Sequence, residues 1–196
     1  VEEFVTNPEQ REALVASFTS ERAVRKIRSS LPKSVTEPPP ELITILDLSP
    51  INHLPVLIQI LNVERRQSSR SVLRSLLGRY VEDQSEKVIS SLKDFEDSVA
   101  LDLMDALFEK NQEFGHAIIW DLRETESPAV LHKILNMLIE LGATYKYKSW
   151  LLDLLQNTKV DGVRAKVLGL IGPLAERELF EVLEKILLTD WNLSEE

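Results

Sequence analysis

The sequence predicts an all-α protein built from a row of helix pairs, and three observations lead to this prediction. Aromatic residues make up only 6% of the 196 residues, leucine dominates the apolar ones, and runs of Val, Ile, Thr and aromatics are missing, which favours helices over strands. Apolar residues recur at helical spacing almost without a pause from residue 41 onward. The helical pattern also repeats along the chain, which is typical of stacked helical units.

The repeats are clearest in four segments that each begin at a valine: Val72, Val99, Val130 and Val163. Each segment has apolar residues four, five and eight positions after its valine, on one face of a helix. The valines are 27, 31 and 33 residues apart. Another apolar segment precedes each valine, so each unit is predicted to be a first helix, a polar turn and a second helix. The predicted first helices are 53–61, 85–92, 115–122 and 149–155, and one at 176–188 begins a further unit.

The chain is expected to have three parts. Residues 1–31 are predicted to be an N-terminal helical region, in which Asn7 caps a helix and Pro8 takes its first position; a second helix follows Ser20. Residues 32–41 contain three successive prolines, which favour an extended connector. The repeat array itself occupies residues 42–196, with a helix start at Ser49-Pro50.

The second helices are expected to end about twelve residues after their valines, at Gln84, Asn111, Gly142 and Ala175. Gly and Asn end helices at low cost because they tolerate the left-handed conformation. We therefore expect left-handed caps at Asn111 and Gly142.

The last of the four second helices resembles those of HEAT-like repeats of the short bacterial type, in the armadillo/HEAT superfamily. The residues that carry this resemblance are Val163-Arg164, Val167-Leu168 and Ile171-Gly172. The unit at Val130 matches the same pattern, whereas the unit at Val99 has no Gly and the unit at Val72 lacks the Leu-Gly ending. The resemblance covers residues 50–190. It implies a right-handed α–α superhelix, or solenoid, of about four to six helix pairs that share one continuous core.

Two glycines and a proline interrupt the end of this helix, at Gly169, Gly172 and Pro173. In a stacked array, a residue without a side chain lets a neighbouring helix approach closely. We expect Gly169 and Gly172 to serve this purpose, and the alternative is that they only end the helix early.

No catalytic residue, metal site or cofactor is predicted, and the protein is not expected to be an enzyme. Cysteine is absent, and His53, His116 and His132 do not have metal-ligand spacing. The sequence contains no phosphate-binding glycine loop and no nucleophile elbow. The many carboxylates are expected to lie exposed on helix surfaces, where their pKa values would not suit acid–base catalysis.

Two charged features are the candidate partner-binding residues. Asp102, Asp105 and Glu109 lie on one helical stripe, and Lys133, Asn136 and Lys166 occupy equivalent positions in later units. A basic cluster also occurs in this acidic chain, and Arg70 and Arg74 are its candidate binding residues; its members are Arg65, Arg66, Arg70, Arg74 and Arg79. The resemblance implies that the stripe forms a ridge on the concave surface. The alternative is that these charges only form ion pairs between repeats.

The tryptophans Trp120, Trp150 and Trp191 lie near the ends of predicted first helices. Buried, they would be packing residues, and exposed, they would indicate a contact surface. The sequence leaves both interpretations open.

The resemblance implies a non-catalytic scaffold that binds a partner protein along its concave surface, because HEAT-like arrays are mostly interaction platforms. The chain begins at Val1 rather than Met, so another domain of a longer protein is an equal candidate for the partner. The alternatives are a HEAT-like enzyme acting on nucleic acid (of the DNA glycosylase type), a lyase that attaches bilins, and a structural spacer. A net charge of −9 argues against nucleic acid.

The location predicted from the sequence is the cytoplasm. The absence of cysteine favours a reducing compartment, no signal-peptide pattern begins the chain, and no apolar run is long enough to cross a membrane. The oligomeric state is left open.

Overall fold

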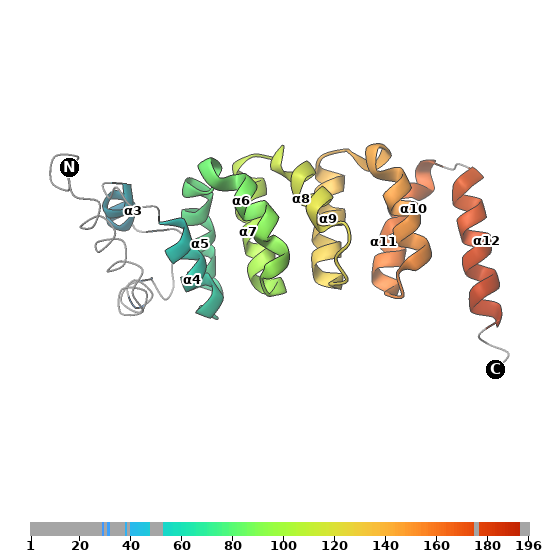
Figure 1. Ribbon diagram of the computed structural model, residues 1–196, viewed down its shortest axis with the longest axis horizontal. Helices are drawn as coiled ribbons and strands as arrows, with labels where there is room; N and C mark the ends of the chain where they lie inside the picture. Colours follow the sequence, from blue (N-terminus) through green and yellow to red (C-terminus); the bar gives the residue numbers. More distant parts are fainter. Residues whose placement is uncertain are drawn as a thin grey trace. The chain divides into compact units, whose positions relative to one another are not determined.

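The computed structural model describes residues 40–47, 53–174 and 177–192, together with residues 29, 31 and 38 (Figure 1). All regular secondary structure in these ranges is helical and none of it is strand, which confirms the all-α prediction. The helices predicted at Asn7 and Ser20, the helix start at Ser49-Pro50 and the cap at Ala175 lie outside the described residues. Pro40, predicted to be part of the connector, begins a helix.

The chain divides into two compact units, of which the first is Val1–Phe114. Its described helices are α3 (Pro40–Asp47), α4 (Leu54–Val63), α5 (Gln67–Tyr80), α6 (Ser85–Ser91) and α7 (Asp97–Lys110), with 3₁₀ turns η1 (Glu82–Gln84) and η2 (Leu92–Asp94). Helix α5 packs against both α4 and α7. Leu76 and Leu77 of α5, and Leu103, Met104 and Leu107 of α7, are fully buried. They lie four and five positions after Val72, and four, five and eight positions after Val99, so the apolar spacing in the sequence marks the buried face.

The second unit is Gly115–Glu196. Helix α8 (Phe114–Leu122) begins at the boundary and is followed by α9 (Pro128–Glu140), η3 (Thr144–Tyr147), α10 (Lys148–Asn157), α11 (Asp161–Ile171), η4 (Gly172–Leu174) and α12 (Arg177–Asn192). Helix α10 packs against α11 and α12, and α11 also packs against α9. Ser127 caps α9, because its Oγ accepts a hydrogen bond from the Val130 N–H at 3.3 Å, and Pro128 takes the first helical position.

The cap predicted at Gly142 is present. Its φ is +59°, the left-handed conformation, and it follows the last turn of α9. The Ala143 N–H donates to the Leu138 carbonyl at 3.1 Å and the Gly142 N–H to the Ile139 carbonyl at 3.0 Å, which is the Schellman pattern. Asn111 also ends its helix as predicted, since it is the C-cap of α7, but the left-handed conformation predicted for it is wrong. Its φ is −153°, and its side chain accepts a hydrogen bond from the Glu113 N–H at 2.9 Å.

The expectation that Gly169 and Gly172 allow a close helix approach is also wrong. A Cβ built at either position would meet no atom within 4 Å, so space is not what either glycine provides. The α-helical part of this segment ends at Ile171, and Gly172 and Pro173 continue as the short 3₁₀ turn η4. A close approach occurs at Gly162 instead, where a Cβ would lie 3.3 Å from Nε2 of His132.

Candidate functional site

The predicted basic cluster and acidic stripe meet between α5 and α7. Arg70 and Asp102 form an ion pair at 2.5 Å, with only 9% and 11% of their side chains exposed. Arg74 pairs with Asp105 at 2.8 Å and lies 3.8 Å from Asp102. Burial raises the pKa of Asp102, and the positive charges of Arg70 and Arg74 oppose that shift. These four residues therefore join α5 and α7, the second helices of two successive helix pairs, as the ion-pair alternative describes.

Arg70 does more than pair with a carboxylate. Its guanidinium donates to the carbonyls of Leu61 at 3.2 Å and Glu64 at 2.9 Å, at the end of α4, and to the carbonyl of Ser98 at 2.7 Å, in α7. The last carbonyls of a helix have no partner within the helix, so the buried arginine satisfies those of Leu61 and Glu64. Arg70 is thus a link among α4, α5 and α7.

Two carboxylates among the described residues are buried, which contradicts the expectation that the carboxylates lie exposed. Asp102 is 8% exposed and Glu64 is fully buried. The Glu64 carboxylate accepts hydrogen bonds from the backbone N–H groups of Arg65 and Arg66, both at 2.9 Å, and from the Arg66 guanidinium. A buried charge is tolerated when it is paired and fully hydrogen-bonded. The sequence signal was the position of Glu64, directly between the apolar end of a predicted helix and two arginines.

The remaining charges predicted to bind a partner have varied surroundings. Lys166 donates to Oδ1 of Asn136 and, at 3.3 Å, to the carbonyl of His132, which links α11 to α9. Burial lowers the pKa of Lys166. Lys133 is half-buried and Glu109 is exposed. Within each unit the structure thus brings several of these residues together as pairs, and a partner-binding role for them stays a prediction.

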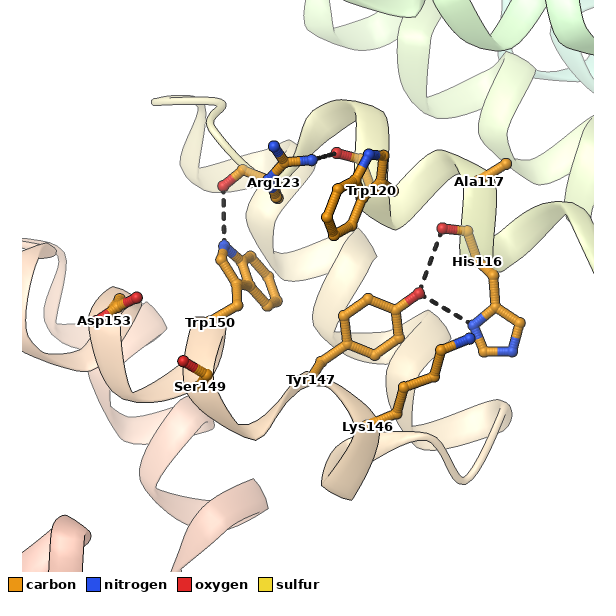
Figure 2. Close-up of a pocket in the computed structure, with 9 residues that line it drawn as sticks. All are labelled: His116, Ala117, Trp120, Arg123, Lys146, Tyr147, Ser149, Trp150 and Asp153. Carbon is orange, nitrogen blue, oxygen red and sulfur yellow. Dashed lines mark hydrogen bonds between the residues drawn. The ribbon is translucent and has the colours of Figure 1, made fainter.

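A pocket of about 650 Å³ in the second unit is the strongest candidate site (Figure 2). It is lined by α8, η3 and α10, which means by the first helices of two successive pairs and not by the second helices that carry the predicted ridge. Aromatic rings and charged groups dominate its wall. The lining residues are His116, Ala117, Trp120, Arg123, Lys146, Tyr147, Ser149, Trp150 and Asp153.

Trp120 is 64% exposed, and it is one of several large apolar residues exposed in the described parts of the chain. The Arg123 guanidinium carbon lies 3.9 Å from the centre of the Trp120 ring, and Nη1 of Arg123 donates to the Trp120 carbonyl at 2.7 Å. The indole N–H of Trp150 donates to the Arg123 carbonyl at 3.0 Å. Trp150 therefore holds the backbone of Arg123, and Trp120 holds its guanidinium.

The opposite end of the pocket is formed by His116 and Tyr147. Their rings are stacked, with centroids 5.9 Å apart and an interplanar angle of 17°. The Tyr147 hydroxyl lies 3.1 Å from Nδ1 of His116 and donates to the His116 carbonyl at 3.3 Å. Burial raises the pKa of Tyr147, so its hydroxyl stays protonated at neutral pH. Figure 2 shows the Lys146 side chain extending along this end, toward the His116 ring.

The pocket offers two kinds of contact to a ligand. Its aromatic faces offer stacking and apolar contact, and Arg123 and Lys146 offer donors to an anion. In the described parts of the chain, no three histidines, aspartates or glutamates are grouped so that they could hold a metal ion. The sequence left open whether Trp120 and Trp150 are packing or contact residues, and it did not single out Arg123, Lys146 or Tyr147. The available signal was the segment 145–150, which has three aromatic residues in a chain with few of them.

In the described residues, the fold is all-helical and carries a pocket lined by aromatic and cationic side chains. No protein-family model, no curated protein and no solved structure matches this chain. None of the helices within the described ranges combines the length and the apolar character needed to cross a lipid bilayer.

Proposed function

We propose that this chain is a non-catalytic interaction module with a HEAT-like architecture, and that it binds a partner protein at the pocket formed by α8, η3 and α10. The partner is a separate protein or another domain of a longer chain. The observation that carries this proposal is the exposure of Trp120 at the edge of a pocket whose other walls are also aromatic.

The HEAT-like part of the proposal is supported by the order of the helices. The described chain from residue 53 alternates first and second helices as α4–α5, α6–α7, α8–α9 and α10–α11, and α12 follows as a further first helix. The aligned valines Val72, Val99, Val130 and Val163 are all buried. Repeating units that each bury the same face against the next are the basis of a solenoid.

Exposed tryptophans are uncommon because leaving an indole in water forgoes a large apolar stabilisation. Tryptophan and arginine are also the residues that most often dominate the binding energy of protein interfaces. Trp120 and Arg123 combine both types within one turn of chain, and their positions are fixed by contacts within the protein. A surface that is ordered before binding loses less conformational entropy when a partner docks.

The pocket is a better candidate than the predicted ridge because of how their charges are engaged. The ridge carboxylates Asp102 and Asp105 are already paired with Arg70 and Arg74. A partner that used those charges would have to break internal ion pairs, one of them buried, and the free energy lost would reduce the gain from binding. Trp120, in contrast, is 64% exposed even with the Arg123 guanidinium against its ring.

The test is a selection of binding peptides from a random displayed library against the immobilised chain, followed by affinity measurement by fluorescence anisotropy. We expect selected peptides to lose at least about tenfold in affinity for Trp120→Ala, because a tryptophan at the centre of an interface contributes about 2 kcal/mol or more. Ile139→Ala is the matched control, since Ile139 is 53% exposed and lies outside the pocket. Equal binding to the wild type and Trp120→Ala would contradict the proposal. A library that yields no binder would instead favour a structural spacer.

A second candidate function, action on nucleic acid, is favoured by one observation. The pocket brings two indoles and a phenol together with Arg123, Lys146 and the carboxylate of Asp153, and flat aromatic faces can stack on bases. The net charge of −9 opposes it. Titration with single-stranded oligonucleotides at low salt, followed by tryptophan fluorescence, separates the two functions: quenching that disappears in Trp120→Ala would support this second function.

A further inference from the structure

The cations of the pocket differ in the contacts that hold them. Arg123 is held by the Trp120 carbonyl, by the Trp120 ring and, through its own backbone, by the Trp150 indole. Lys146 is exposed, and its ammonium lies 5.7 Å from the centre of the Tyr147 ring. Arg123 thus presents a planar cation in a fixed orientation, with further N–H groups beyond those used internally.

Arg123 has a charged neighbour that a ligand can replace. Its Nη2 lies 3.3 Å from Oε1 of Glu124, whose side chain is 84% exposed. Ion pairs of this kind contribute little to stability because water screens them and the side chains lose entropy when they pair. A ligand carboxylate that makes two parallel hydrogen bonds to the guanidinium would therefore displace Glu124 at small cost.

The aromatic wall next to Arg123 selects for an apolar group. Figure 2 shows the rings of Trp120, Tyr147 and Trp150 around one hollow, with Arg123 at one end and Lys146 at the other. The polar atoms of Tyr147 and Trp150 are already hydrogen-bonded within the protein. What these two rings offer to a ligand is therefore mainly their apolar surface.

Resting on the proposed function, we infer that the ligand of this pocket is a peptide segment with an acidic side chain next to an aromatic or large aliphatic one. The carboxylate binds Arg123 in a bidentate manner, and Lys146 provides a second, exposed cation. The apolar side chain fills the hollow between Tyr147 and Trp150. The lining contains two cations, Arg123 and Lys146, and one carboxylate, Asp153, in a chain whose net charge is −9.

A peptide carboxylate fits the site better than a nucleic acid phosphate chain. Binding along a phosphate backbone depends on many cations in a row. The pocket has only Arg123 and Lys146, with the carboxylates of Glu124 and Asp153 close to them in the chain or in the lining. One anionic group with an apolar neighbour matches this composition.

The experiment uses fluorescein-labelled peptides in matched pairs, one of each pair containing Asp or Glu beside Phe or Leu and the other containing Asn or Gln in place of the acid. Affinities for the wild type, Arg123→Gln, Arg123→Lys and Lys146→Gln are measured by anisotropy at fixed salt. We expect the acidic peptide to bind about 10- to 100-fold more weakly to Arg123→Gln, as is usual when a charge-assisted hydrogen bond is removed. Arg123→Lys should recover only part of the loss because a lysine cannot bind in a bidentate manner.

Each outcome decides between distinct possibilities. If library peptides bind in a Trp120-dependent way but the acid and its amide bind equally, the acidic-ligand inference is overturned while the proposed function stands. If oligonucleotides compete with the acidic peptide at equal or higher affinity, the site is a nucleic acid site and the inference fails. If no peptide binds at all, the proposed function fails with it. Circular dichroism of each variant, compared with Ile139→Ala, shows whether a loss of binding reflects a loss of folding.

Discussion

Replacing Arg70 by methionine should strongly destabilise the first unit. The side chain is 9% exposed, pairs with Asp102 at 2.5 Å and donates to three backbone carbonyls. Removing one partner of a buried pair costs about 3–5 kcal/mol, because the other charge stays buried without compensation. Since a domain of this kind is stabilised by about 5–15 kcal/mol in total, the loss is large. Urea unfolding followed by circular dichroism at 222 nm measures it.

A double-mutant cycle shows whether the pair is the cause. Asp102→Leu alone should also destabilise the protein, because Arg70 is then left as a buried charge without its carboxylate. The variant with both changes should be more stable than the two separate losses predict, with a coupling energy of about 1–3 kcal/mol, as is found for residues in direct contact. Arg79→Met serves as the control: Arg79 pairs with Asp47 at 3.0 Å, but both side chains are almost half exposed, so its loss should stay below about 1 kcal/mol. Additive effects within about 0.5 kcal/mol, or an Arg70→Met loss no larger than that of Arg79→Met, would refute the reasoning.

Three further results are expected. Gly142→Ala should lower the free energy of unfolding by about 1–2 kcal/mol because the backbone there is left-handed. Gly169→Ala, on an open helix surface, should raise the free energy of unfolding by up to about 1 kcal/mol. Thermal unfolding that gives the opposite signs would contradict both assignments. Burial lowers the pKa of His53 below its ordinary 6.5, so its contribution to stability is complete above pH 6.5 and is lost as the pH falls through the folded pKa. The urea midpoint of the wild type should therefore fall more steeply below pH 6.5 than that of His53→Gln. Equal slopes for the two proteins would exclude this role of His53. If the helix pairs continue as a superhelix, small-angle scattering should give a radius of gyration well above the value of about 16 Å for a compact chain of this length, and a value near 16 Å would contradict the HEAT-like proposal.

Helix positions were predictable from the sequence because helix formation depends on spacing within one segment. Val72, Leu76 and Leu77 lie on one face whatever the rest of the chain does, and the structure buries all three. The cap at Gly142 was predictable for the same reason, since an achiral residue after a helical pattern is a local signal. Asn111 shows the limit of such signals, because its side chain had another hydrogen bond to make.

The candidate site was not predictable because it depends on residues that are distant in sequence. Trp120 and Trp150 are thirty positions apart, and only the placement of α8 near α10 brings them into one pocket. The exposure of Trp120 likewise depends on which other elements pack against α8, and the sequence of α8 alone does not show this. The same holds for the buried carboxylates: Asp102 lies on a charged stripe in sequence, and only the approach of α5 brings Arg70 to it.

Trp150 serves two purposes. Its indole N–H, bonded to the Arg123 carbonyl, links consecutive helix pairs, and its ring forms a wall of the cavity. A molecule bound against that wall would stabilise the contact between the two helix pairs, and by mass action it would make local opening of the α8–α10 region less frequent. Amide hydrogen exchange around residues 123 and 150 would then report occupancy even when nothing else in the molecule moves. Substitution of Trp150 should therefore change both stability and binding, whereas substitution of the exposed Trp120 should change mainly binding.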